Sequence, residues 1–329
     1  MKHRNLRLQY LKPRVSARSL PGIVLFLLAL TGCGRAVAPG LEGQPSGPYT
    51  LTLDLDTPPV PGRPNTLVFS LTRTENRKPV SDLQIIHERA LHTFIVARDF
   101  SSFAHIHQED FGPLTAQDLA AARFTFPYAF PRAGQYRIVN EFTHHDRTWR
   151  KQFNVTVGAP AAIPQVNIDL GRARIVQGYQ ASLALSPPRA VAGAEAELVL
   201  TLTHAGEPVT NLELLLGAEV HVALWRIDGE YFGHAHSYTP EMVAMMRAMA
   251  GHSAAHSEAM MLKMMAAPAR LVYPGPRIPI RITFPEPGFY QLFIQCAPGG
   301  KPLVFPFMIE VAPDHQGLDT KLESIVPDA

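Results

Sequence analysis

The chain has 329 residues, with 30 Lys and Arg against 28 Asp and Glu and a formal net charge of +2 at pH 7. This length allows two domains of ordinary size, and the balance of charges gives no support for a nucleic-acid partner. A hydrophobic fraction of 46%, with 30 prolines and 23 glycines, suits short strands separated by turns.

Residues 1–32 have the pattern of a lipoprotein signal peptide. Six basic residues and no acid lie in the first twenty positions, and residues 21–30 (PGIVLFLLAL) form an apolar run that is too short to span a bilayer. Leu30, Thr31, Gly32 and Cys33 resemble the bacterial lipobox, whose cysteine is diacylated before cleavage. This resemblance predicts an exported protein held to a lipid bilayer through acylated Cys33. An ordinary signal peptide with a free thiol is the alternative.

The residue after this cysteine is Gly34 and not Asp. By resemblance to Gram-negative lipoproteins, this indicates the periplasmic face of the outer membrane if the host is Gram-negative. Cleavage before Cys33 leaves 24 Lys and Arg against 28 Asp and Glu, a formal charge of −4, so no nucleic-acid partner is expected. With Cys33 acylated, Cys296 has no partner for an intramolecular disulfide and is expected to be a buried, inert thiol.

An internal repeat organises the rest of the chain. Residues 79–83 (PVSDL) recur as residues 208–212 (PVTNL), an offset of 129, and both copies share the pattern H-x6-D-x3-F-x-H-x-H. Residues 130–136 match residues 284–290 at an offset of 154, so the second copy contains 25 extra residues after its histidine motif. The matched motif residues are His92, Asp99, Phe103, His105 and His107 in the first copy and His221, Asp228, Phe232, His234 and His236 in the second.

Both copies contain strand patterns. Residues 66–72, 136–142, 198–203 and 290–294 alternate apolar and polar positions and are rich in β-branched and aromatic side chains. The sequence therefore predicts an all-β protein of tandem immunoglobulin-like β-sandwiches, which we call the first and second modules. The expected order is a signal peptide (1–32), a flexible tether (33–48), the first β-sandwich repeat (49–158), a linker (159–178), the second repeat (179–313) with a helical insertion (238–270), and a loose tail (314–329).

Each histidine motif is predicted to form a β-hairpin. A two-residue turn at Asp228 and Gly229 pairs His221 with His236, and directly opposed residues point to the same face with Cβ atoms about 5 Å apart. His234 shares this face because it lies two residues before His236. The same register in the first copy brings together His92, His105 and His107. Three imidazoles with an open position suit Cu(II) or Zn(II).

This prediction depends on the register, because a three-residue loop would send the first and last histidines of a motif to opposite faces. The other interpretation is that these histidines are polar residues on a solvated strand or buried residues bonded to backbone carbonyls. Asp99 and Asp228 are expected to form Asx turns rather than to orient an imidazole. His87, His144 and His145 have no histidine counterpart in the second copy; they are expected at the surface, with extra ligands of the first site as the alternative.

The insertion carries a further candidate metal site. Methionines at i, i+3, i+4 and i+7 share one helical face, and His252 and His256 lie one helical turn apart. Thioether and imidazole together select Cu(I) over Zn(II). The other interpretation is a helical hairpin whose methionine face packs on the sandwich or on a partner. The candidate ligands are Met242, Met245, Met246, Met249, His252, His256, Met260, Met261, Met264 and Met265.

Residues 87–109 and 130–136, with their counterparts 217–236 and 284–311, resemble a family of secreted bacterial immunoglobulin-like modules, the YtkA-like and copper-resistance-associated β-sandwich proteins. The resemblance covers most of both modules and implies extracytoplasmic metal handling. Gln108 and Ser237 depart from it, since a proline often follows the HxH in that family. In some small copper carriers the N-terminal amine is a metal ligand. An acylated N-terminus cannot supply this ligand.

The chain has no nucleophile elbow, phosphate loop, paired-carboxylate motif or HExxH, so hydrolase and kinase functions have no support. The patterns predict a non-enzymatic, membrane-tethered protein that binds copper, as Cu(I) or Cu(II), with zinc as the other candidate. It would buffer the metal or pass it to another envelope metal-handling protein. The alternatives are an envelope scaffold or adhesion module and a copper redox enzyme.

Overall fold

The computed structural model describes residues 41–42, 47–159, 165–249, 252–267 and 269–314, all within one compact unit. The predicted signal peptide and Cys33 lie outside the described residues, as does nearly all of the predicted tail. The described chain is mostly β-strand with a few small helices, which confirms the predicted fold class of tandem immunoglobulin-like β-sandwiches.

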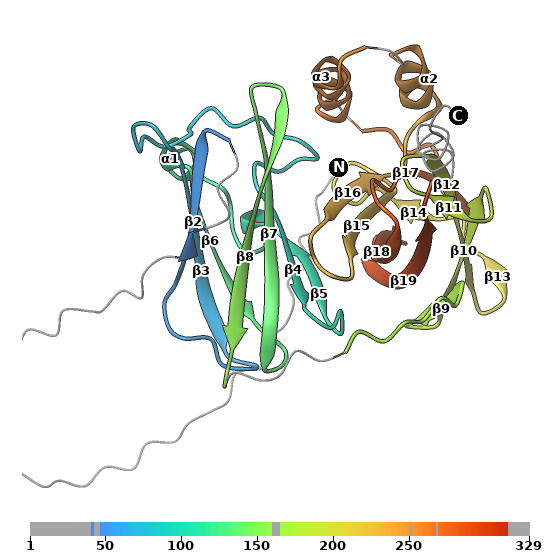
Figure 1. Ribbon diagram of the computed structural model, residues 1–329, viewed down its shortest axis with the longest axis horizontal. Helices are drawn as coiled ribbons and strands as arrows, with labels where there is room; N and C mark the ends of the chain where they lie inside the picture. Colours follow the sequence, from blue (N-terminus) through green and yellow to red (C-terminus); the bar gives the residue numbers. More distant parts are fainter. Residues whose placement is uncertain (1–40, 43–46, 160–164, 250–251, 268, 315–329) are drawn as a thin grey trace, which may run out of the picture. The chain divides into compact units, whose positions relative to one another are not determined.

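The first module contains two four-stranded sheets, with strand orders β1-β2-β3-β6 and β5-β4-β7-β8 (Figure 1). β1 lies in the segment expected to be a tether and pairs with β2. The strands are β1 (Leu41–Glu42), β2 (Tyr49–Leu55), β3 (Pro64–Arg73), β4 (His92–Ala97), β5 (Phe103–Ile106), β6 (Arg123–Ala129), β7 (Gly134–His144) and β8 (Arg147–Val157).

The second module contains a five-stranded sheet, β13-β12-β10-β9 with β17 beside β12, and a six-stranded sheet, β11-β19-β18-β15-β16 with β14 beside β18. β9 lies in the segment expected to be a linker, and it pairs with β10. The strands are β9 (Ala173–Val176), β10 (Tyr179–Ser186), β11 (Ala190–Val191), β12 (Glu195–His204), β13 (Glu207–Pro208), β14 (Leu212–Glu213), β15 (Val220–Arg226), β16 (Phe232–His236), β17 (Arg277–Thr283), β18 (Gly288–Pro298) and β19 (Leu303–Ala312).

The sequence repeat is also a repeat of topology. The order β5-β4-β7-β8 of the first module recurs as β16-β15-β18-β19 in the second, and β2-β3-β6 recurs as β10-β12-β17. Each histidine motif therefore occupies the same edge hairpin of the same sheet in both modules, namely β4-β5 and β15-β16.

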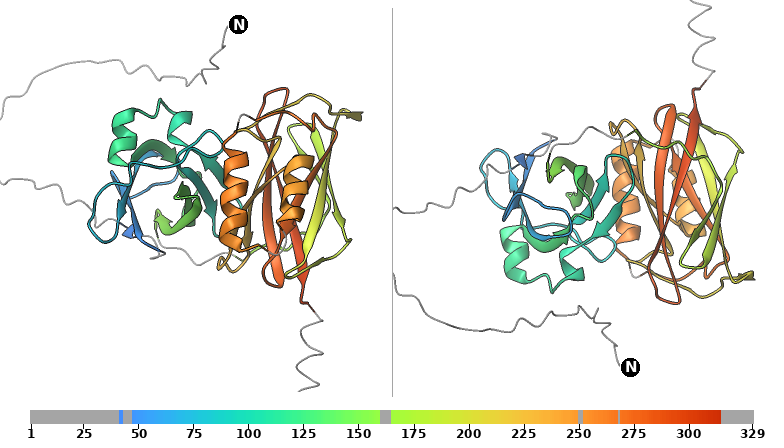
Figure 2. Two further views of the ribbon diagram at one scale, coloured as in Figure 1. Left: turned by 90° about the horizontal axis from the view of Figure 1, so that it is seen from above. Right: turned by 90° about the horizontal axis from the view of Figure 1, so that it is seen from below.

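Helices are confined to connections. The 3₁₀ helix η1 (Gln108–Asp110) and α1 (Ala116–Ala121) follow β5, whereas α2 (Pro240–Ala248) and α3 (Ala254–Met265) form the insertion after β16. Thr239 caps α2 and Ser253 caps α3, each through a side-chain oxygen that accepts a backbone N–H. The two insertion helices contact each other (Figure 2), and α3 also contacts β8 of the first module. In the described part of the chain, no helix combines the length and apolar character needed to cross a membrane.

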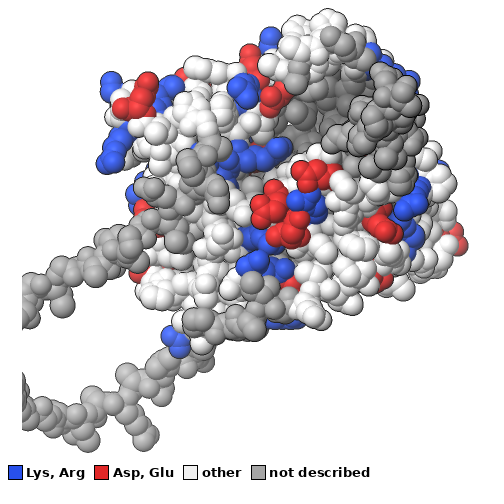
Figure 3. All heavy atoms as spheres, in the orientation of Figure 1, with Lys and Arg blue, Asp and Glu red and all other residues white. Residues whose placement is uncertain are grey.

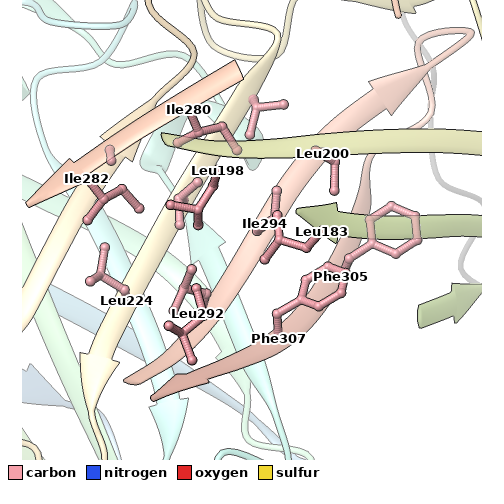
Figure 4. Packing of buried hydrophobic residues seen from close by; sticks show 14 of the residues in the cluster. Leu183, Leu198, Leu200, Leu224, Ile280, Ile282, Leu292, Ile294, Phe305 and Phe307 are labelled. Atoms are coloured by element: carbon pink, nitrogen blue, oxygen red, sulfur yellow. The ribbon is translucent and has the colours of Figure 1, made fainter. Parts of the chain in front are cut away.

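Each module has its own hydrophobic core between its two sheets. In the second module, Leu198 and Ile280 from one sheet face Leu292 and Ile294 from the other (Figure 4). Along β3 and β12, buried positions alternate with partly exposed ones, as period-2 strands with one covered face require. The predicted alternation over residues 66–72 and 198–203 is therefore confirmed.

β4 and β15 follow a different rule, because both of their faces are covered. Every residue of β4 is buried, and only the last residue of β15 is partly exposed. Ile95 and Val222 point into their own module's core, whereas Phe94 and Trp225 join a third cluster built from both modules. This shared cluster consists of Phe94, Val96, Phe100, Val139, Ala223, Trp225 and Phe293.

On the surface drawn in Figure 3, Lys and Arg side chains are interspersed with Asp and Glu side chains. Several charged side chains of the described residues form ion pairs. Arg281 contacts Glu195 and Glu197, and Arg226 contacts Asp228 and Glu286.

Candidate metal centre

The hairpin register predicted for the histidine motifs is confirmed. His221 pairs directly with His236. In the first module Thr93 pairs with Ile106, and the same register extended by one residue places His92 opposite His107. The predicted two-residue turn is wrong. Hydrogen bonds from Arg226 N to Tyr231 O and from Ala97 N to Ser102 O close four-residue loops. A four-residue loop with the same centre takes one more residue from each strand than a two-residue turn does. The residues farther along the two strands therefore stay opposite the same partners.

The first triplet consists of His92, His105 and His107, and its ring nitrogens form a nearly equilateral triangle. His92 Nδ1 lies 3.2 Å from His105 Nε2, and His107 Nε2 lies 3.1 Å from each of these two atoms. A tetrahedral ion with metal–nitrogen bonds of about 2.0 Å holds its ligand nitrogens about 3.3 Å apart. The triangle therefore has the dimensions of one face of a tetrahedral site.

The outer ring nitrogens of the first triplet are tied to acceptors. His92 Nε2 donates to the carbonyl of Ile86 at 3.0 Å, and His107 Nδ1 donates to Asp110 at 3.1 Å. His105 Nδ1 donates to Oε1 of Gln295, in the second module, at 2.9 Å. Because an imidazole that donates from one nitrogen keeps a lone pair on the other, all three lone pairs lie within the triangle.

Burial keeps these imidazoles in the form that binds metals. Burial, followed by the repulsion of neighbouring imidazoles, lowers the pKa of His92 and His105 well below the ordinary histidine value. The pKa of His107 is also lowered by burial, although Asp110 opposes the shift. Neutral imidazole is the ligand form, so the first triplet is ready to bind at neutral pH.

The second triplet, His221, His234 and His236, repeats the main features of this arrangement. His234 Nε2 lies 3.3 Å from His221 Nδ1 and 3.1 Å from His236 Nε2. His221 Nε2 donates to the carbonyl of Leu215 at 2.7 Å, which corresponds to the bond from His92 to Ile86. His234 Nδ1 donates to Oε1 of Glu141, in the first module, at 2.9 Å. Burial also lowers the pKa of His221 and His236 well below the ordinary value.

His87 joins the second triplet, contrary to the expectation of a surface residue or a ligand of the first site. It is 7% exposed, and its ring centroid lies 4.0 Å from that of His236. One ligand atom from each of His87, His221 and His236 falls within 4.8 Å of the others. Its Nε2 lies 3.1 Å from the sulfur of Met265, and its Nδ1 has no hydrogen-bond partner among the described residues.

A tight turn accounts for the position of His87. The backbone bonds between Ile86 and Arg89 close a turn whose two central residues, His87 and Glu88, have φ values of 48° and 65°. The same turn provides the Ile86 carbonyl that orients His92, so it contributes to both sites. The sequence signal is weak, because Leu216 occupies the equivalent position in the second copy.

The expectation of surface positions is also wrong for His144, which is fully buried, whereas the side chain of His145 is 73% exposed. Both ring nitrogens of His144 have protein partners, since Nδ1 lies 2.5 Å from the Tyr49 hydroxyl and Nε2 lies 2.9 Å from Asp82. Asp82, His144 and His145 are close enough to hold an ion. They lack the free convergent lone pairs that the first triplet has.

The other predicted positions divide into two groups. Asp99 and Asp228 form Asx turns by accepting the backbone N–H of Ser101 and Glu230, as predicted. Cys296 is a buried free thiol, and burial raises its pKa to about 12, which agrees with the expected inert role.

The structure brings only part of the insertion to the histidines. Met242, Met264 and Met265 line a cavity of about 200 Å³ together with His87 and His236. His252 and His256 are exposed, and their rings stack on each other with centroids 5.3 Å apart. Met249 is buried, and the remaining predicted ligands, Met245, Met246, Met260 and Met261, are partly buried on α2 and α3.

The two triplets adjoin each other across the contact between the modules. The ring centroid of His105 lies 5.5 Å from that of His234 and 5.8 Å from that of His221, and His92 lies 5.7 Å from His234. The phenyl ring of Phe103 stacks on that of Phe293 at 4.4 Å beside them. Sequence reasoning treated the modules separately and missed this contact, although the apolar run over residues 94–97 of β4 is typical of a strand covered on both faces.

Comparisons with known proteins identify a family but no activity. Among curated proteins, none matches the chain. The Escherichia coli adhesin FdeC is similar in structure at 12% sequence identity and a TM-score of 0.23, over 80% of this chain and 64% of that one. Invasin, a bacterial integrin-binding protein, is similar at 12% identity and a TM-score of 0.22, over 80% of this chain and 40% of that one.

The chain thus spans less than two thirds of the length of either adhesin chain. The family model that matches covers residues 44–159 and 174–313, which correspond to the two modules. The chain therefore belongs to the family described as Domain of unknown function (DUF8832).

Proposed function

We propose that this protein is a lipid-anchored, extracytoplasmic copper-binding protein that buffers copper or passes it to another envelope protein. The observation that carries the proposal is the convergence of buried imidazole nitrogens in both modules. Three nitrogens lie 3.1–3.2 Å apart in the first triplet, and His234 Nε2 lies within 3.3 Å of a ring nitrogen of both His221 and His236 in the second. Histidines that served only as polar packing residues would have no need to bring ring nitrogens together in both modules.

The choice of copper over zinc rests on the insertion. Three imidazoles suit both metals, but the thioether sulfur of Met265 lies beside His87, at the edge of the second triplet. Soft sulfur ligands favour Cu(I) over Zn(II). An ion that contacts a methionine sulfur before it reaches the histidines is therefore better matched to copper than to zinc. The resemblance of the histidine motifs to copper-resistance-associated modules supports the same choice.

A binding role is favoured over catalysis because the triplets are enclosed. The side chain of His234 is 2% exposed. The cavity that touches His92 measures only about 30 Å³, room for about one water molecule. Substrate pockets usually measure about 300–1,000 Å³, which is larger than this cavity and larger than the cavity of about 200 Å³ beside His87 and His236. We therefore propose a non-enzymatic role.

Metal analysis tests the proposal directly. The mature protein, loaded with Cu(II) and desalted, is expected to retain two ions per chain, and a variant that combines His105→Ala with His234→Ala is expected to lose both. His204→Ala is the matched control, because His204 is exposed and lies outside every histidine cluster in the described residues. Tight zinc binding with weak copper binding would contradict the choice of metal. If no metal were retained, a scaffold or adhesion role would replace the proposal.

The membrane anchor has a separate test, because it rests on the LTGC sequence at Cys33 alone. Cys33→Ala is expected to move the protein from the membrane fraction to the soluble fraction or to leave the precursor uncleaved. Normal processing together with unchanged fractionation would show that Cys33 is not acylated. Substitution of Cys296, the buried thiol, serves as the control and is expected to leave fractionation unchanged.

A further inference from the structure

The two triplets share a set of reciprocal contacts that neither module could make alone. The middle histidine of the first triplet, His105, donates to Gln295 of the second module, and the middle histidine of the second triplet, His234, donates to Glu141 of the first. Both hydrogen bonds measure 2.9 Å. Each module therefore fixes the orientation of one ligand in the other module's site.

The two acceptors occupy equivalent positions. Glu141 pairs with His92 across β7 and β4, and Gln295 pairs with His221 across β18 and β15. They also match at the sequence offset of 154 that relates these strands. Each acceptor therefore lies beside the first histidine of its own triplet while it bonds the middle histidine of the other.

Two bound ions would also be close together. The ring centroids of His105 and His234 are 5.5 Å apart, and each ion would lie about 3 Å from the centroid of its ligand ring, so the ions could be no more than about 12 Å apart. The two triplets are therefore parts of one structural centre, and the ions would influence each other electrostatically in this buried region.

The one chemical difference between the equivalent acceptors is charge. Glu141 has a carboxylate whose other oxygen accepts from Arg150 at 2.6 Å, which keeps the group ionised, whereas Gln295 has a neutral carboxamide. The positive charge of Arg150 balances the negative charge of the Glu141 carboxylate. Glu141 therefore affects the second site mainly through its charge-assisted hydrogen bond with His234. A carboxylate acceptor raises the basicity of the ligating imidazole more than a carboxamide does, and a more basic donor set favours the ion of higher charge.

We propose that the two triplets form one paired copper centre, in which Glu141 makes the second triplet the preferred site for Cu(II) and Gln295 leaves the first triplet comparatively better suited to Cu(I). This inference rests on the proposed copper-binding function. It assigns to Glu141 and Gln295 the role of positioning residues that act through the hydrogen bonds to His234 and His105.

Exchange of the two acceptors provides the test. Each site is measured alone, the second in a background of His92→Ala with His107→Ala and the first in a background of His221→Ala with His236→Ala. The ratio of Cu(II) to Cu(I) affinity is obtained by competition with chromophoric chelators. We expect the ratio to be about 10–100 times higher for the second site, the range typical of partners that orient metal ligands.

Glu141→Gln is expected to lower the ratio of the second site toward that of the first, and Gln295→Glu to raise the ratio of the first site. Both changes are isosteric, but Glu141→Gln removes the ion pair with Arg150 and Gln295→Glu adds a buried carboxylate, so circular dichroism and thermal unfolding are used to verify that each variant is folded. If the ratio of Cu(II) to Cu(I) affinity changed in neither variant, the roles assigned to Glu141 and Gln295 would be overturned. The bound copper would still support the proposed function. If neither site bound copper in any background, the proposed function itself would fail.

Electron paramagnetic resonance tests the pairing. The protein with Cu(II) in both sites is expected to show dipolar broadening that is absent from the two single-site backgrounds, because the ions would be within about 12 Å. A doubly loaded spectrum equal to the sum of the two single-site spectra would overturn the paired centre.

Discussion

The β4-β5 hairpin of the first module and the β15-β16 hairpin of the second share one motif, one register and one set of ligand atoms, yet they have different surroundings. The middle histidine of the first is oriented by a neutral amide, and that of the second by a buried carboxylate. The second also lies beside His87 and the methionine insertion. The comparison teaches that a duplicated ligand set can remain constant while the residues around it make its two copies chemically distinct.

Removal of one triplet at a time has the largest expected effect. His92→Ala with His107→Ala, and separately His221→Ala with His236→Ala, should each reduce the Cu(II) content from two ions per chain to one, because three-histidine sites do not survive the loss of two ligands. Metal analysis by mass spectrometry measures the stoichiometry. Loss of both ions in either variant would show that the two sites fill only together.

The shared cluster between the modules provides the next prediction. Trp225 is fully buried and is matched in the first module by the smaller Val96. Trp225→Ala should lower the free energy of unfolding by about 3–5 kcal/mol, the usual cost of emptying a large buried site. Trp225→Phe is the matched control and should cost less, because the indole N–H has no hydrogen-bond partner among the described residues. Chemical denaturation measures both variants, and equal costs would argue against cavity formation as the cause.

Deletion of residues 242–265 tests the second difference between the modules. We expect Cu(I) affinity to fall by about 10–100-fold while Cu(II) stoichiometry stays at two, since thioethers select the reduced ion. Titration of Cu(I) against a chromophoric chelator gives the affinity. Met242→Leu, Met264→Leu and Met265→Leu together preserve the apolar volume, so they separate ligation from packing. Unchanged Cu(I) affinity in both the deletion variant and the triple Leu variant would leave α2 and α3 as a packing or docking element.

The smallest predicted effect concerns His87, which the second copy replaces with Leu216. Burial lowers the pKa of His87 from 6.5 to about 4, so the folded, metal-free protein keeps it neutral while the unfolded chain takes up a proton as the pH falls below 6.5. The stability that depends on neutral His87 is present above pH 6.5 and is lost as the pH falls toward 4. Between pH 7.5 and pH 6, His87→Leu should lose about 1 kcal/mol less stability than the wild type. Urea unfolding at the two pH values measures the difference, and identical pH dependence would contradict it.

Much of the site was predictable because it is local in sequence. The spacing of the histidines, together with a turn centred midway between them, determines which residues oppose each other in a hairpin, and this placed His221 opposite His236. The turn length was not predictable, since two-residue and four-residue loops with the same centre give the same register. The side-chain period of two along a strand decided that all three histidines of each motif share one face.

The sequence alone determined the repeat, the β-rich class and the six triplet histidines, because periodicity, spacing and turn chemistry act over a few residues. Only the tertiary structure decided that the two histidine faces meet, that Glu141 and Gln295 are exchanged between the sites, and that His87 belongs to the second triplet. These contacts join residues about 90 to 190 positions apart, as for Glu141 with His234 and His105 with Gln295. No local pattern encodes such contacts, since they follow from which sheet faces remain uncovered once each module has formed its own core.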